Sequence, residues 1–246
     1  MRLSILVVAA SVVCGGVAAA EPADADVDGA ERLLADDGTA TPADAARGLA
    51  LLLKAAEAGD GRAQYRLGTL FLTGRVVTQD DGTAAYWLTR AAEAGIGAAE
   101  SNLGLLTLQG RGVARDPQAA AVLLRRAAAK DIAAAQHNLG WMAQMGEGMA
   151  PSRAEALRWY SAAAQSGYSP SQYNLGVLLA DGDGGEGTAD PAGAVKWLSL
   201  AGLSRHPDVH RQATARLVEL SRAVPPEAVA TGLDDARRWL ASGRVQ

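Results

Sequence analysis

The chain has 246 residues, of which 49% are hydrophobic and only 4% aromatic, and its 23 basic and 27 acidic residues give a net charge of −4. This length is enough for one large or two ordinary domains, and a core so poor in aromatic residues favours packed helices of Ala and Leu over a β-sheet. The acidic balance and the scattered basic residues argue against a nucleic acid as the partner.

The first twenty residues have the organisation of an export signal. Arg2 supplies a positive start, residues 3–13 form an apolar stretch, and residues 18–20 are three alanines that suit a cleavage site. We therefore expect residues 1–20 to be a signal peptide and residues 21–26 a flexible leader. The mature protein is then predicted to be periplasmic or secreted.

The single cysteine, Cys14, raises the alternative of a lipoprotein. Val12 and Val13 argue against it, because a lipoprotein signal favours small residues before the cysteine. Cleavage after Ala20 would leave a mature chain without a cysteine, and therefore without a disulfide. No later stretch approaches the roughly 20 apolar residues of a transmembrane helix, so we expect no membrane span.

The rest of the sequence repeats with a period of 36 residues. The dipeptide Leu-Gly recurs at 67–68, 103–104, 139–140 and 175–176, each copy being followed six residues later by another glycine, at Gly74, Gly110, Gly146 and Gly182. Paired alanines recur at 55–56, 91–92, 127–128 and 163–164. A fixed period of this length indicates a repeat protein in which each unit is a helix-turn-helix.

The first helix of each unit is predicted from its apolar face and its end. Ala63, Leu67 and Leu70 fall on one face of a helix, and Gly74 and its counterparts are expected to end these helices in the left-handed conformation. The glycine of each Leu-Gly pair lies inside the helix, where it costs about 0.5–1 kcal/mol relative to alanine. We therefore expect it to admit a neighbouring helix at close range, packed through the paired alanines.

The second helix of each unit is predicted from its start. Three N-cap residues precede a proline, which suits the first helical position, and these are Thr41, Asp116 and Asp190. Ser152 and Glu155 have the spacing of a capping box.

The repeated unit contains, in order, Ala-x-x-x-Leu-Gly, Gly-x-Gly-Val, Asp, Ala-x-x-Trp and Ala-Ala-x-x-Gly. This pattern resembles that of the Sel1-like repeat family, which is related to the tetratricopeptide repeats. The best match is residues 99–131, where Gly110, Gly112, Val113 and Asp116 are in place and Leu123 replaces the tryptophan. The resemblance implies an all-α fold, a right-handed α-α superhelical solenoid of about five helix-turn-helix repeats with a C-terminal capping hairpin. The expected units are 27–58, 63–94, 99–130, 135–166 and 171–203, followed by a helical cap over residues 204–246.

No motif for catalysis or metal binding emerges. His206 and His210 are spaced like two metal ligands but lack a third, and the acidic residues of the glycine-rich turn 182–187 do not follow the EF-hand pattern. Motifs for a nucleophilic serine are absent as well. We expect no catalytic residue, metal or cofactor. Cysteine-rich secreted relatives have been linked to penicillin binding or hydrolysis, so a cell-wall or β-lactam-related hydrolase or binding protein is the alternative, although this chain lacks their paired cysteines.

A surface stripe on the first helices is the candidate binding site. The predicted partner-binding residues are Tyr65, Arg66, Asn102, His137, Trp141, Tyr173 and Asn174. Mixed aromatic and polar strips anchor protein ligands, so we expect a scaffold for a protein or peptide partner in the periplasm. The resemblance adds envelope assembly or regulation of a membrane sensor as roles. Two alternatives stay open: hydrogen bonding between repeats for the asparagines, and burial against the neighbouring repeat for Trp141.

Overall fold

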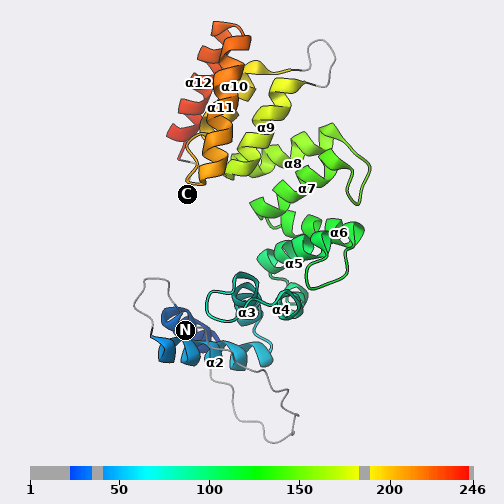
Figure 1. Ribbon diagram of the computed structural model, residues 1–246, viewed down its shortest axis with the longest axis vertical. Helices are drawn as coiled ribbons and strands as arrows, with labels where there is room; N and C mark the ends of the chain where they lie inside the picture. The colour runs from blue at the N-terminus through cyan, green and yellow to red at the C-terminus, as the bar shows by residue number, and fades with distance from the viewer. Residues whose placement is uncertain (1–22, 35–40, 183–188, 244–246) are drawn as a thin grey trace, which may run out of the picture. The chain divides into compact units, whose positions relative to one another are not determined.

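The computed structural model describes residues 23–34, 41–182 and 189–243, a part of the chain that forms twelve helices and no strand (Figure 1). In chain order the helices are α1 (Ala23–Leu33), α2 (Pro42–Glu57), α3 (Gly61–Thr73), α4 (Asp81–Glu93), α5 (Gly97–Gln109), α6 (Pro117–Ala128), α7 (Ala133–Met145), α8 (Arg153–Gln165), α9 (Ser169–Asp181), α10 (Pro191–Ala201), α11 (Pro207–Ala223) and α12 (Pro226–Ala241). The chain divides into two compact units, Met1–Leu123 and Leu124–Gln246, with the boundary inside α6.

The expected signal peptide and glycine-rich turn are not described by the structure, whereas part of the expected leader is. The signal peptide expected at residues 1–20 and residues 183–187 of the glycine-rich turn lie outside the described residues. Helix α1 begins at Ala23, so residues 23–26 of the expected flexible leader form the first turn of a helix.

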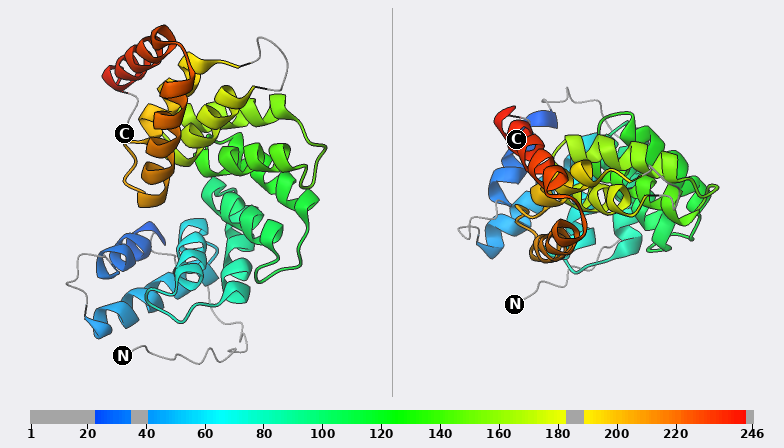
Figure 2. Two further views of the ribbon diagram at one scale, coloured as in Figure 1. Left: turned by 45° about the horizontal axis from the view of Figure 1, so that its top comes forward. Right: turned by 90° about the horizontal axis from the view of Figure 1, so that it is seen from above.

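Consecutive helices pair as hairpins. Helix α1 packs on α2, α3 on α4, α7 on α8 and α9 on α10, and the hairpins are joined by contacts of α2 with α3, α4 with α5 and α8 with α9. The further views in Figure 2 likewise show helices throughout. Within each of the two units, successive hairpins thus contact one another, which is typical of an α-helical repeat solenoid and confirms the predicted fold class.

The first helices end where the glycines predict. Helices α3, α5 and α7 end at residues in the left-handed conformation, with φ of 67°, 70° and 73° at Gly74, Gly110 and Gly146. Gly182 ends α9 differently, since its φ of 61° is combined with an extended ψ of −166°. That combination is open essentially to glycine alone, so the residue type is still explained by the backbone.

The second helices begin at the predicted caps, with one correction. Thr41 forms a complete capping box with Asp44, and Asp190 accepts a hydrogen bond from the Gly193 N–H. Ser152 accepts from the Glu155 N–H at 3.2 Å, but the Glu155 carboxylate pairs with Arg158 at 2.9 Å rather than returning to the cap. The capping box predicted at Ser152 is therefore only half formed.

The glycine of three of the four Leu-Gly pairs lies in tight contact with the second helix of its hairpin. A Cβ added to these glycines would meet the large residue one position after the tryptophan slot of the second helix: 2.6 Å from Leu88 Cγ at Gly68, 2.7 Å from Tyr160 Cδ1 at Gly140 and 2.7 Å from Leu198 Cγ at Gly176. The predicted close approach is confirmed. The predicted neighbour is wrong, because the glycines face these large side chains and not the paired alanines.

Two helices follow the last hairpin and cover it. Helix α11 contacts α10 and α9, and α12 contacts α10 (Figure 1). Leu198 of α10, Leu220 of α11 and Leu233 of α12 belong to one apolar cluster. Gly232 brings α12 close to α10, since a Cβ there would lie 2.4 Å from the Ala192 carbonyl oxygen. Within the described ranges, no helix is both long and apolar enough to cross a bilayer.

Candidate functional site

The most exposed part of the predicted stripe lies on α7. Trp141 is 37% exposed and Met145, one helical turn later, is 57% exposed. Both are apolar side chains that a folded chain usually covers, and their i, i+4 spacing places them on the same face of the helix. This pair, Trp141 and Met145, is called the α7 anchor below.

His137 lies one turn before Trp141 but faces the interior. Its Nδ1 is 2.9 Å from the Ser171 Oγ of α9, and its ring lies 5.5 Å and 5.3 Å from the ring centroids of Tyr160 and Tyr168. Burial lowers the pKa of the imidazole to about 4, so it is neutral at physiological pH. Ser171 is fully buried, which leaves this serine–histidine pair without access to a substrate.

Asn174 takes part in a second polar contact, with Tyr160 of α8. The fully buried Tyr160 of α8 donates its hydroxyl hydrogen to the Gln144 Oε1 at 3.1 Å, and it is also hydrogen-bonded to the Asn174 side chain. Burial raises the pKa of the Tyr160 hydroxyl to about 12, against the opposing effect of Asn174. The side chains of α7, α8 and α9 are thus joined by hydrogen bonds, in which Asn174 takes part.

The two tyrosines of the stripe are half-buried and pack against apolar clusters. Tyr65 packs against a cluster that includes Leu88 and Leu103, and Tyr173 against one that includes Leu198 and Leu220. Arg66 and Asn102 are also half-buried, and the Arg66 Nε is buried with no hydrogen-bond partner among the described residues. These four side chains are therefore less available to a partner than the α7 anchor.

Helix α11 covers the part of the stripe on α9. Val177 and Tyr173 of α9 share an apolar cluster with Leu217 and Leu220 of α11, and the Arg216 Nη2 of α11 lies 2.5 Å from the Asp181 Oδ1. The sequence pattern could not show this, because it gives no indication of which face the terminal helices cover. Of the predicted residues on α7 and α9, Trp141 is left as the exposed aromatic side chain.

A row of buried amides, which the predicted site does not include, links successive repeats. In three repeats, the Nε2 of a glutamine in the first helix donates a hydrogen bond to the carbonyl oxygen of the second paired alanine of the preceding repeat. The donor–acceptor distances are 3.0 Å for Gln64 and Ala56, 3.5 Å for Gln136 and Ala128, and 3.3 Å for Gln172 and Ala164. The paired alanines are thus contacts between repeats. The recurrence of Gln at intervals of 72 and 36 residues, at Gln64, Gln136 and Gln172, is the sequence signal that predicts these contacts.

Glu100 occupies the same position in the remaining repeat and is fully buried. We expect Gln136→Glu to destabilise the protein by about 1–2 kcal/mol, because it removes the N–H that donates to the Ala128 carbonyl oxygen and buries a carboxylate in its place. Urea unfolding followed by circular dichroism measures the difference. The matched control is Gln118→Glu, at an exposed position of α6, which should change the stability by less than about 0.5 kcal/mol. Equal stability of Gln136→Glu and the wild type would contradict this account.

His137 makes the stability depend on pH. The unfolded imidazole binds a proton as the pH falls through about 6.5, whereas the buried one stays neutral down to about 4. The unfolded state therefore binds more protons between these values, so the contribution of His137 is complete above pH 6.5 and declines by about 2–3 kcal/mol towards pH 4. Unfolding titrations of the wild type and His137→Gln check this. Parallel pH profiles of the two proteins would contradict it.

No metal centre is formed by the described part of the chain, where no three His, Cys, Asp or Glu side chains gather as ligands. His210 is instead engaged with the backbone, its Nδ1 lying 2.5 Å from the Gly202 carbonyl oxygen. What the geometry offers is an exposed apolar pair on a rigidly supported helix.

Comparison with known families explains the period. The profile of the Sel1 repeat matches residues 30–60, 61–96, 97–132, 133–168 and 169–206. The chain belongs to the Sel1 repeat family. Scaffolds built from Sel1 repeats are typically non-enzymatic.

Solved structures show the same fold. A Sel1 repeat protein from Oxalobacter formigenes is 23% identical, with a TM-score of 0.65 over 87% of this chain and 82% of that one. A protective antigen of uropathogenic Escherichia coli with an SLR fold is 22% identical, with a TM-score of 0.67 over 91% of this chain and 54% of that one. This chain thus spans about half the length of the antigen. No curated protein matches the sequence.

Proposed function

We propose that this Sel1 repeat protein is an exported adaptor that binds a protein or peptide partner in the cell envelope, stoichiometrically and without turnover. The observation that carries the proposal is the α7 anchor, in which Trp141 and Met145 are exposed on one face of a helix. Sel1 repeats support a protein as the partner. The envelope follows from the signal peptide predicted at residues 1–20, and regulation of a sensor or an envelope assembly is the role this location suggests.

The surroundings of the α7 anchor suit recognition. The Tyr160 hydroxyl of α8 is hydrogen-bonded to Gln144 of α7, and His137 of α7 is hydrogen-bonded to Ser171 of α9. A helix fixed in this way loses little conformational freedom when a partner binds. Tryptophan is also the residue type most often found to carry the binding energy of an interface, since it buries a large area with few rotatable bonds.

Crosslinking in the periplasm tests the adaptor. We expect a crosslinked partner to be recovered with the wild type and to be lost with Trp141→Ala, whose truncation should weaken binding by about 30-fold. The matched control is Tyr86→Ala, which removes an aromatic side chain that is 54% exposed on α4. Recovery of the same partner in equal amount from Trp141→Ala would refute the α7 anchor as the binding site.

The location is tested separately by the mass of the protein in the periplasmic fraction. Processing after Ala20 predicts a mature chain that begins at Glu21 and lacks Cys14. An unprocessed chain in the cytoplasmic fraction would contradict export. A mass that includes a lipid on Cys14 would instead support the lipoprotein alternative.

A further inference from the structure

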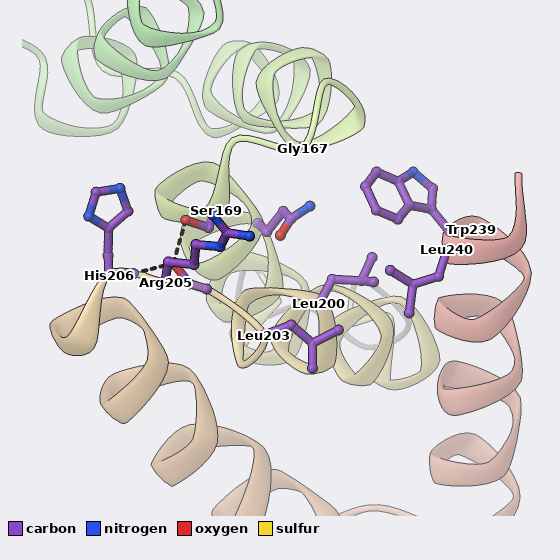
Figure 3. A pocket seen from close by; sticks show the side chains of 10 residues that line it. Gly167, Ser169, Leu200, Leu203, Arg205, His206, Trp239 and Leu240 are labelled. Atoms are coloured by element: carbon purple, nitrogen blue, oxygen red, sulfur yellow. Dashed lines mark hydrogen bonds between the residues drawn. The ribbon is translucent and has the colours of Figure 1, made fainter. Parts of the chain in front are cut away.

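A pocket of about 480 Å³ opens where the last hairpin meets the two terminal helices (Figure 3). Its walls come from the link between α8 and α9, from α9 and α10, from the link between α10 and α11, and from α12. The side chains that line it include those of Leu200, Leu203, Arg205, His206, Trp239 and Leu240. This volume is within the range that small ligands occupy in proteins.

One side of the pocket is apolar. Leu200 and Trp239 are buried in its wall, whereas Leu203 and Leu240 are 66% and 41% exposed. Figure 3 shows Trp239 and Leu240 together on one side, with Leu200 and Leu203 between them and the opposite side. A pocket that leaves large aliphatic side chains open to water favours a ligand with an aliphatic part.

The opposite side is cationic. Arg205 and His206 lie there, in the link that leads into α11, and no acidic side chain is among the described residues that line the pocket (Figure 3). Asp208, the nearest acid along the chain, is 2.5 Å from Arg211 and so is already paired. In a protein whose net charge is −4, a pocket lined by a basic residue and no acidic one selects for a negative ligand.

The serine hydroxyls of the pocket are bonded within it, whereas the Arg205 side chain is exposed. The Ser169 and Ser204 hydroxyls are 2.8 Å apart, and the His206 N–H donates to the Ser204 Oγ at 3.1 Å, which fixes the link beside Arg205. The Trp239 Nε1 is buried in the wall and has no hydrogen-bond acceptor among the described residues, so it is not open to a ligand. The Arg205 guanidinium is exposed, and it favours a ligand that supplies acceptor oxygens over one that supplies donors.

We propose that this pocket binds an anionic amphiphile, a medium-length aliphatic chain that ends in a carboxylate. The chain would lie against Leu200, Leu203 and Leu240, and the carboxylate would accept hydrogen bonds from the Arg205 guanidinium. The site is separate from the α7 anchor, none of whose residues lines it. It therefore does not depend on the proposed adaptor function.

Calorimetry on the full chain with three ligands of equal chain length tests the chemistry of the head group. We expect decanoate, below its micelle concentration, to bind, and decan-1-ol and decyltrimethylammonium to bind at least about tenfold more weakly, because only the carboxylate pairs with Arg205. Butyrate should also bind weakly, because it covers little of the apolar wall. Equal binding of decanoate and decan-1-ol, or no binding of decanoate, would overturn the proposal.

Two exposed positions test the site without disturbing the fold. Arg205→Ala is expected to weaken decanoate binding about tenfold and Leu203→Ser to weaken it as well, whereas Arg222→Ala, an exposed arginine on α11 outside the pocket, should leave it unchanged. A peptide ending in leucine with a free carboxylate is the comparison ligand. If that peptide binds in an Arg205-dependent way and decanoate does not, the pocket takes a protein C-terminus and the proposal fails. An unchanged affinity in Arg205→Ala would equally refute it.

Discussion

Gly112→Ala is expected to destabilise the protein by about 3–5 kcal/mol. Gly112 has φ of 69°, a conformation that already costs other residues about 1–2 kcal/mol. An added Cβ would also lie 2.0 Å from the carbonyl oxygen of Asp81, which is a backbone atom. The Cβ itself is fixed to the backbone of residue 112. Neither can move aside as a flexible side chain could, so the link between α5 and α6 must shift away from the start of α4.

That shift would break a second contact. The guanidinium of Arg111 holds the Asp81 carboxylate with two hydrogen bonds, of 2.9 Å from Nε and 2.8 Å from Nη2. The pKa of the Asp81 carboxyl is lowered by this pairing, chiefly by the hydrogen bonds from Arg111. This pair is only partly buried and contributes little by itself, but it lies beside the close backbone contact of Gly112 with Asp81.

Gly95→Ala is the matched control for Gly112→Ala. Gly95 has φ of 83° and nothing within 4 Å of an added Cβ, so it measures the backbone strain alone. We expect a loss of about 1–2 kcal/mol there. The two variants are compared by urea unfolding followed by circular dichroism. Equal losses would show that contact with Asp81 plays no part.

Gly140→Ala is expected to cost about 2–3 kcal/mol, even though alanine is the better helix former. The added Cβ would lie 2.7 Å from Tyr160 Cδ1 and 2.8 Å from its Cε1. Tyr160 is fully buried and its hydroxyl is held by Gln144, so the ring has little room to move. Helices α7 and α8 must therefore separate.

The control for Gly140→Ala is a helical glycine with space around it. Gly29 in α1 has only Leu51 Cδ1 near an added Cβ, at the ordinary contact distance of 3.9 Å. Gly29→Ala should accordingly stabilise the protein by about 0.5–1 kcal/mol. Thermal unfolding of both variants gives the comparison. Changes of the same sign in the two would contradict the packing role of the Leu-Gly glycine.

The candidate site was only partly predictable. The 36-residue recurrence placed Trp141 and His137 on one helix, and Trp141 is indeed exposed. The same recurrence gave no indication that His137 turns inward to Ser171, because a histidine suits both a buried and an exposed position. Tyr173 was predicted to be available, yet α11 shares its apolar cluster, a contact between segments with no repeat relationship.

The sequence by itself determined the repeats of this Sel1 protein: their period, the two helices of each unit, and most of the residues that begin and end them. These features depend on contacts within a few residues of one another, where cap side chains and left-handed glycines act directly on the local backbone. Only the tertiary structure decided that the Leu-Gly glycines face Leu88, Tyr160 and Leu198, that buried amides link successive repeats, and that the terminal helices cover α9 and form a pocket. The physical reason is that these contacts depend on how helices cross and on which large side chains fill the space between them, and the periodicity of a single helix contains neither.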